Sequence, residues 1–179
     1  MSLSLLSIIL GVLALGGGVY GLVNPEVARK WADGFSRNVV IGYVLTLLAT
    51  GWFVYNVSLE NIADFAPYKK HMMIGFAALG VATCLYVKDF LAVRGLSVLL
   101  LLTAKLMVDT ARWHDSELRL FVIALAYAWV IAGMWLAISP WRMRDWISWA
   151  TKEEKRFRIL NGIKAGFGGV LVLLGLFVF

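Results

Sequence analysis

Charge is the scarcest property of this 179-residue chain, in which only 16% of the residues are charged and 61% are apolar. Soluble domains carry about 25% charged and 45–50% apolar residues. A soluble fold of this length could not cover its surface with so few polar groups. Lipid removes that requirement, because the outside of a membrane protein is apolar. The composition therefore excludes an ordinary soluble domain and predicts an integral membrane protein.

Cysteine and proline are also rare. The only cysteine, Cys84, lies in an apolar run, so no disulfide can form within the chain and a buried structural thiol is expected. None of the three prolines (Pro25, Pro67 and Pro140) interrupts an apolar run. Broken helices in inverted repeats are typical of alternating-access transporters, and this sequence does not show that pattern.

Apolar runs are what the sequence has in abundance. A bilayer core of roughly 30 Å needs about 20 helical residues, fewer where flanking lysines extend to the interface. The first run has no basic residue before it and no small-residue cleavage site after it, so it is expected to be a membrane helix, not a signal peptide. The runs that qualify as spans are Leu3–Val23, Val39–Val57, Met72–Val87, Phe90–Val108, Leu120–Ile138 and Ala165–Phe179.

These runs predict an all-α, polytopic transmembrane bundle that forms one membrane domain over residues 1–179. We expect about six helices in three hairpins, 1–57, 71–108 and 118–179. The junction between residues 87 and 90 contains only Lys88 and Asp89 as charges. A tight turn there would place both in water, and a re-entrant or kinked pair is the alternative.

The basic residues predict the orientation. The linkers 24–38, 88–94 and 139–164 share one side and contain 3, 2 and 7 of the 17 basic residues. Lys and Arg collect on the cytoplasmic side of membrane proteins, so both termini are expected outside. The formal charge is +6, but the basic residues do not form a patch interleaved with exposed aromatic residues, so a nucleic-acid partner is not expected. The basic residues are expected to contact anionic lipid headgroups.

Two of the basic linkers are expected to form helices that lie on the membrane surface. In 26–37, Val27, Trp31 and Phe35 recur every four residues between basic side chains. The segment 141–157 has a similar apolar stripe with basic residues around it. An apolar face below and a basic face above is the interfacial pattern.

The two ends of the chain resemble each other around these linkers. Pro25, Arg29 and Trp31 match Pro140, Arg144 and Trp146 with one constant offset. Proline cannot continue the preceding helix but fits the first turn of the next one. The outer hairpins are therefore interpreted as duplicates, and their repeat is parallel because each starts on the outer side.

The C-terminal hairpin also resembles a known family. Its Pro140-Trp141-Arg142 motif, followed by Arg158, Gly162 and the glycines Gly168, Gly169 and Gly175, is similar to the small two-helix YjeT-like inner-membrane proteins. The similarity covers about 45 residues. That family is uncharacterised, so the resemblance implies the inner membrane of a bacterium and no particular activity.

One group of charged residues could serve a function. Lys105, Asp109 and Arg112 are spaced i, i+4 and i+7, which places them on one helix face. Ionisable groups within a membrane are candidates for an ion or proton pathway. The alternative is structural, with Asp109 and Arg112 at the headgroups and Lys105 extending to the interface or pairing with Asp109.

The two histidines, His71 and His114, are both expected near the outer surface. Antiparallel neighbouring helices could bring them together as ligands of a haem or as a quinone site. Polar residues at helix ends are the alternative explanation. No cysteine or carboxylate cluster completes a metal site, so no metal is expected.

Glycines indicate where helices pack closely. Gly17 and Gly21 form one G-x-x-x-G motif, and Gly162 and Gly166 form another. Small residues let two helices approach each other, whether within one chain or between chains.

No catalytic residue is identified, because no Ser/His/Asp, Cys/His or paired-carboxylate set shares a depth and a side. The leading hypothesis is therefore a non-enzymatic accessory subunit that packs with other membrane subunits or with copies of itself. A small ion or proton transporter or channel, and an electron-transfer subunit, are the alternatives.

Overall fold

The computed structural model describes residues 2–61 and 63–179, and within them the chain forms eight α-helices, a short 3-10 helix and no strand. Met1 and residue 62, which falls between the expected spans Val39–Val57 and Met72–Val87, lie outside the described residues. The all-α fold class is confirmed. The α-helices are α1 (Leu3–Val23), α2 (Pro25–Phe35), α3 (Val39–Leu59), α4 (Lys69–Tyr86), α5 (Leu91–Ala111), α6 (Arg119–Ile138), α7 (Trp141–Thr151) and α8 (Glu154–Phe177), and the 3-10 helix is Ala63–Tyr68.

Short polar segments separate these helices where the sequence predicts. The backbone N–H of Asn24 still bonds to Tyr20 O at 2.9 Å, and α2 then begins at Pro25. Proline fits there because the first turn of a helix needs no backbone N–H from it. The side chain of Asn38 accepts a 3.0 Å bond from Ile41 N and so caps the start of α3.

Five helices are long and apolar enough to cross a membrane, namely α1, α3, α5, α6 and α8, among the residues that the structure describes. They support a membrane location for the chain. The expected third span is α4, which is helical over 18 residues but does not meet the same criterion of length and composition. Its first turn contains Lys69, Lys70 and His71, and these polar residues reduce its apolar character. A sixth span therefore remains a prediction.

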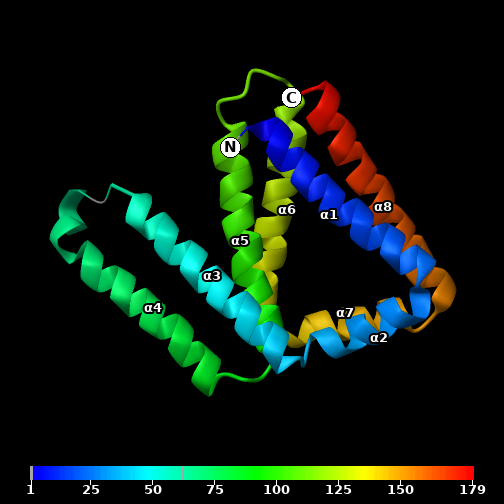
Figure 1. The fold of residues 1–179 in the computed structure, drawn as a ribbon, viewed down its shortest axis with the longest axis horizontal. Helices are drawn as coiled ribbons and strands as arrows, with labels where there is room; N and C mark the ends of the chain where they lie inside the picture. Colours follow the sequence, from blue (N-terminus) through cyan, green and yellow to red (C-terminus); the bar gives the residue numbers. More distant parts are fainter. Residues whose placement is uncertain (1, 62) are drawn as a thin grey trace.

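The long helices alternate in direction, as expected. Both termini and the α5–α6 connection lie at one end of the molecule, and α2, α7 and the α4–α5 connection lie at the other (Figure 1). Residues 87–90 form a turn between α4 and α5, in which Phe90 adopts a left-handed conformation with φ of 55°. The structure therefore has a turn at this junction, and its position relative to the membrane stays a prediction.

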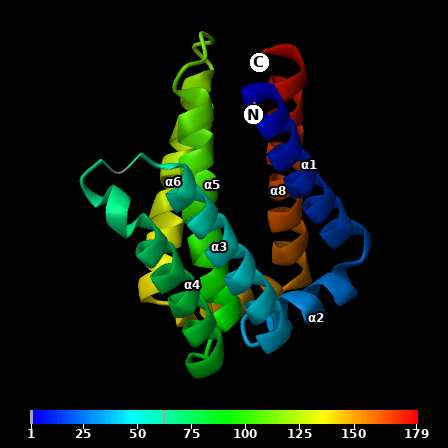
Figure 2. The ribbon, with the colours of Figure 1, turned by 60° about the vertical axis from the view of Figure 1, so that its left-hand side comes forward.

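The packing partners differ from the expected hairpins. Helix α1 packs chiefly along α8, α3 along α4 and α5, and α5 along α6 (Figures 1 and 2). The two long helices of each expected hairpin do not pack chiefly on each other; this holds for 1–57, 71–108 and 118–179. For the two outer segments, α2 and α7 each insert 11 residues, or about 16 Å of helix, between the helices that they join. Packed helix axes lie only 8–10 Å apart, so these connectors hold their flanking helices apart. In the central segment, α3 lies between α4 and α5.

The main core lies at the end of the molecule that carries the termini. There Leu3 and Leu6 of α1 meet Met107 of α5 and Val122 of α6, and each of these side chains is almost completely buried. Phe179 packs against the same cluster. The α1/α8 pair therefore joins the rest of the bundle at this end, and α2 and α7 bridge the other end.

Glycines set the distance between α1 and α8. At Gly11 an added Cβ would lie 2.7 Å from Val172 N, and at Gly18 it would lie 2.6 Å from Ala165 N. Gly168 and Gly175 face the backbone of α1 in the same way. The contacts repeat every seven residues on both helices, because seven residues make about two turns and bring the side chain back to the same face of the helix.

This spacing differs from the predicted G-x-x-x-G contacts. Gly17 and Gly21 do face α8, but they meet the side chains of Lys164 and Asn161, not its backbone. Gly162 and Gly166 face open space, where an added Cβ would meet nothing within 4 Å. They therefore do not mediate the α1/α8 contact, which uses another face of α8.

Candidate functional site

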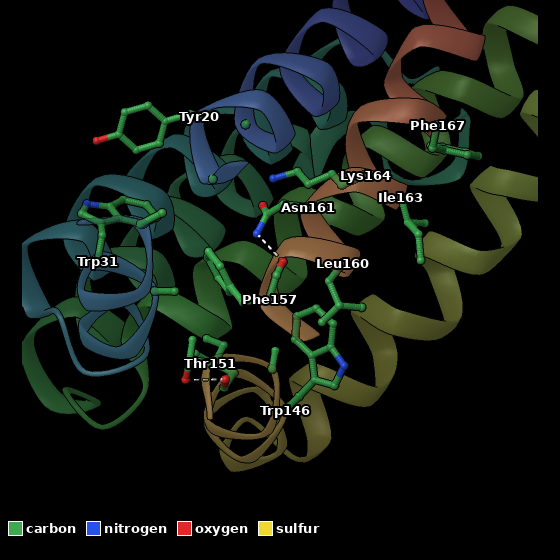
Figure 3. A pocket seen from close by; sticks show the side chains of 16 residues that line it. Tyr20, Trp31, Trp146, Thr151, Phe157, Leu160, Asn161, Ile163, Lys164 and Phe167 are labelled. Atoms are coloured by element: carbon green, nitrogen blue, oxygen red, sulfur yellow. Dashed lines mark hydrogen bonds between the residues drawn. The ribbon is translucent and has the colours of Figure 1, made fainter. Parts of the chain in front are cut away.

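A cavity of about 610 Å³ lies where α1 and α8 meet the surface helices α2 and α7 (Figure 3). Ligand-binding pockets commonly have volumes of 300–1,000 Å³ and apolar walls with a few polar groups. This cavity fits that description. Its lining residues are Gly17, Tyr20, Gly21, Ala28, Trp31, Ala32, Trp146, Ile147, Ala150, Thr151, Phe157, Leu160, Asn161, Ile163, Lys164 and Phe167.

Hydrogen bonds between α2 and α7 close one side of the cavity. The guanidinium of Arg29 donates from Nε and Nη2 to the backbone oxygen of Thr151, at 3.1 and 2.6 Å. The hydroxyl of Thr151 donates to Asp33 Oδ1 at 2.8 Å. Thr151 ends α7, where backbone carbonyls lack partners within the helix and a cation is favourable. This contact holds together the two surface helices that the sequence repeats.

The polar groups of the cavity come mainly from α8. Asn161 donates from Nδ2 to Phe157 O at 2.9 Å, and its Oδ1 faces Gly21 of α1. Lys164 extends from α8 toward α1, beside Asn161 (Figure 3). Its Nζ lies 2.7 Å from the position that a Cβ on Gly17 would occupy. Gly17 and Gly21 therefore leave room on α1 for the ammonium and the amide.

Lys164 has no carboxylate within 4.0 Å among the side chains that the structure describes. It is the one cationic residue among those that line the cavity. Two indole rings, Trp31 from α2 and Trp146 from α7, lie on the other walls and are 63% and 55% exposed. Indole rings favour the depth at which hydrocarbon gives way to headgroups. The arrangement can bind an apolar chain that carries a polar or anionic end.

A smaller cavity of about 180 Å³ lies between α3, α4 and α5. Two of its polar lining atoms, Thr46 Oγ1 and Arg94 Nε, are buried and have no hydrogen-bond partner within the described part of the chain. The hydroxyl of Thr50, also in its wall, donates to Thr46 O at 2.8 Å. Its volume is less than a third of that of the first cavity.

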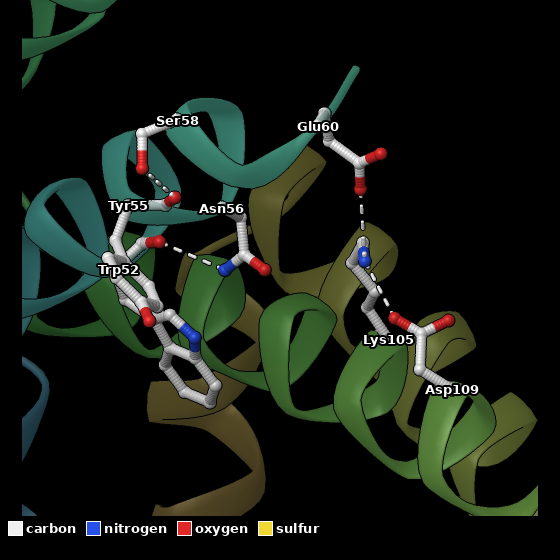
Figure 4. A network of polar contacts seen from close by, with 7 residues as sticks. All are labelled: Trp52, Tyr55, Asn56, Ser58, Glu60, Lys105 and Asp109. Carbon is white, nitrogen blue, oxygen red and sulfur yellow. Dashed lines mark hydrogen bonds and ion pairs between the residues drawn. The ribbon is translucent and has the colours of Figure 1, made fainter.

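The charged group predicted on α5 forms an ion-pair cluster at the surface (Figure 4). Lys105 Nζ lies 2.6 Å from Asp109 Oδ2 and 3.4 Å from Glu60 Oε1 at the end of α3. The side chains of Lys105, Asp109 and Glu60 are 45%, 56% and 59% exposed. The Lys105–Asp109 contact is the pair expected in the structural alternative, and Glu60 adds a carboxylate from another helix.

The third member of the predicted face, Arg112, does not join this cluster. Its guanidinium lies over the ring of Trp113, 5.3 Å from the ring centre. An arginine stacked on an exposed indole is typical of the interface between lipid and water. The structure therefore brings together Lys105 and Asp109 but not Arg112.

The structure does not bring the two histidines together. His114 follows α5, and its ring packs edge-on against Phe179 at 5.4 Å. His71 is exposed in the first turn of α4, which packs chiefly along α3. No described group of three His, Cys, Asp or Glu residues could hold a metal ion. The histidine pair therefore gains no support from the geometry.

Sequence reasoning missed the residues that build the larger cavity. Arg29, Asp33 and Thr151 lie in the two linkers that were expected to be surface helices, but nothing in the sequence indicates that these helices touch. The sequence predicts Lys164 at the end of a linker, whereas it lies in the third turn of α8. The repeated Pro, Arg and Trp pattern was the one signal that the two linkers share a role.

Comparison with known proteins gives no relative for this arrangement: no family model, no curated protein and no solved structure matches the chain.

Proposed function

We propose that the protein is a non-catalytic accessory subunit that packs with other chains in a membrane. The proposal depends mainly on one observation, the outward face of α8. The helix has two sets of glycines, and α1 covers only the set that contains Gly168 and Gly175. The other set, Gly162 and Gly166, faces open space. Small residues on an open face of a membrane helix favour close contact with a further helix.

The loose packing of the bundle supports the same proposal. Only 17% of the most apolar stretch is buried in each of α3, α6 and α8, compared with 44% in α5. Helix α4 packs chiefly along α3, although it is too polar to meet the criterion for a membrane span. Lipid can cover apolar faces, but the polar first turn of α4, with Lys69, Lys70 and His71, is better covered by protein or by water.

The alternatives have less support. Transport through Lys105 and Asp109 would place the ion pathway on an exposed edge of the bundle, where both side chains are about half exposed. An electron-transfer role would require His71 and His114 to face each other, and they pack on different elements. No specific observation supports either alternative.

We also propose the setting of the protein from the sequence: the inner membrane of a bacterium, with both termini outside. The structure places α2, α7 and residues 87–90 at one end of the molecule (Figure 1). These segments belong to the linkers with most of the basic residues, which favours the cytoplasmic side for that end.

Affinity purification from native membranes in a mild detergent tests the accessory role. We expect specific chains, or further copies of this chain, to accompany the wild-type protein. Gly166→Leu fills the open face of α8 and should remove them. Leu176→Val changes an exposed apolar position about 80° around the same helix from Gly166 and should retain them. Recovery of the wild-type chain as a lone stable monomer would refute the proposal.

A further inference from the structure

We propose that the cavity between α1, α2, α7 and α8 is a binding site for an anionic amphiphile. Its hydrocarbon chain would lie along the aromatic walls, and its phosphate or carboxylate would bind the ammonium of Lys164. This inference goes beyond the proposed accessory role and does not depend on it.

The first argument is the unpaired charge. Lys164 lies ten residues, or about 15 Å, along α8 from Glu154, and its amine reaches α1 beside Gly17. Lys164 is an exposed residue, so its ammonium is accessible to a ligand. An anion held at Nζ would form a charge-assisted hydrogen bond, and no described carboxylate of the chain forms one.

The second argument is the shape and chemistry of the walls. The cavity has room for a ligand of ordinary size, and its walls are mainly apolar side chains from four helices. Phe157 and Phe167 line it from α8, and Trp31 and Trp146 line it from the surface helices. Such walls suit a hydrocarbon chain, and they offer almost nothing to a wholly polar solute.

The third argument is charge complementarity around the site. The linkers 24–38 and 139–164, which contain α2 and α7, carry ten basic and five acidic residues, a net charge of +5. Anionic lipids are attracted to such segments near the membrane surface. The local concentration of an anionic amphiphile is therefore raised at the end of the molecule where the cavity lies.

Several other polar groups at or beside the walls are engaged within the chain. The hydroxyl of Thr151 donates to Asp33, and Arg29 donates to the backbone of Thr151. Asn161 donates to Phe157 O. Lys164 is the one cation among the lining residues, so its loss should remove the preference for charge without emptying the cavity.

Native mass spectrometry of the purified full-length protein tests this inference, with phosphatidylglycerol, phosphatidylcholine and oleate added separately. One charge-assisted contact contributes about 1.5 kcal/mol, so the anionic ligand should bind about tenfold more tightly than phosphatidylcholine. Preference for phosphatidylglycerol alone would identify the anionic phospholipid headgroup as the group recognised, and tighter binding of oleate as well would identify any anionic head. Equal affinity for all three would overturn the inference.

Two variants and a matched control locate the site. Lys164→Gln should weaken the anionic ligand about tenfold and leave phosphatidylcholine unchanged. Lys155→Gln, on the same helix but outside the cavity, should leave the affinity for every ligand unchanged. Ala32→Phe fills the cavity and should weaken all ligands. A Lys164→Gln protein that keeps its selectivity, or an Ala32→Phe protein that binds normally, would refute the site, provided that the melting temperature shows each variant folded.

Discussion

The α1/α8 and α3/α4 pairs are both antiparallel, yet they are held together in different ways. In the first pair, Gly11 and Gly168 bring backbone against backbone, and Ser4 Oγ donates to Gly175 O at 2.6 Å. In the second pair, Gly80 faces only the side chain of Thr50, and the rings of Phe53 and Phe76 meet edge-on at 4.9 Å. The closer contact therefore joins segments 171 residues apart, whereas the looser contact joins neighbours in the chain.

This difference shows what determines packing in the bundle. In lipid, apolar side chains gain little by leaving the solvent, so close helix contact depends on small residues and interhelical hydrogen bonds. Helices α1 and α8 have a small residue on the shared face every two turns, and α3 and α4 do not. Proximity in the chain brings α3 and α4 together, but complementary surfaces bring α1 and α8 closer.

A leucine at Gly168 should break the close pair and have the largest effect. The added Cβ would lie 2.7 Å from Gly11 O and 2.9 Å from Leu15 Cα, and backbone cannot move aside as a flexible side chain can. We expect a loss of at least about 3 kcal/mol in unfolding free energy, because overpacking against a rigid neighbour is costly. That loss corresponds to a fall of roughly 10 °C in the melting temperature in detergent.

Gly166→Leu is the matched control for this substitution. It adds the same side chain two residues earlier on the same helix, where nothing lies within 4 Å. The melting temperature of the purified chain should then stay within about 2 °C of wild type. Leucine is a better helix former than glycine, so similar losses for Gly166→Leu and Gly168→Leu would show that the contact with α1 does not determine the effect.

Gly80→Ala should perturb the looser pair less. The new methyl group meets Oγ1 and Cγ2 of Thr50, which can rotate away if the hydroxyl releases Thr46 O. It also lies 2.8 Å from Thr50 Cβ, which only a small shift of the helices relieves. The lost hydrogen bond and this overpacking should together lower the unfolding free energy by about 1–3 kcal/mol. Thermal unfolding of Gly80→Ala, Thr50→Ala and the double variant measures the coupling. The double variant should be more stable than the sum of the single effects, and simple additivity would contradict the contact.

The helices could be predicted from the sequence more fully than their partners. Uninterrupted apolar runs marked the long helices, and Pro25 and Pro140 marked the starts of the surface helices. Helix α8 nevertheless begins at Glu154, not near Ala165, because its charged first turns are also helical and Arg158 pairs with Glu154 at 2.8 Å. The α1/α8 contact depends on a seven-residue spacing divided between the two ends of the chain, and a search for G-x-x-x-G motifs does not detect it.

The same distinction applies to the candidate sites. Lys105 and Asp109 lie one turn apart on one helix, so their contact follows from the sequence spacing. Glu60 reaches Lys105 only because α3 and α5 run side by side. The larger cavity needs four helices in place at once, and no local pattern fixes the contact between α2 and α7 that closes it.

Asp109→Asn should have the smallest effect and also tests the transport alternative. Both members of the ion pair are about half exposed, and Lys105 would still have Glu60 at 3.4 Å. Exposed pairs contribute about 0.2–1 kcal/mol, so the melting temperature should fall by no more than about 2 °C. Proton flux into liposomes should be absent for wild type and variant alike if the chain is an accessory subunit. A wild-type flux that disappears in Asp109→Asn, while the melting temperature stays unchanged, would instead give the surface cluster a role in transport. A purely structural ion pair would affect stability and not the passage of ions.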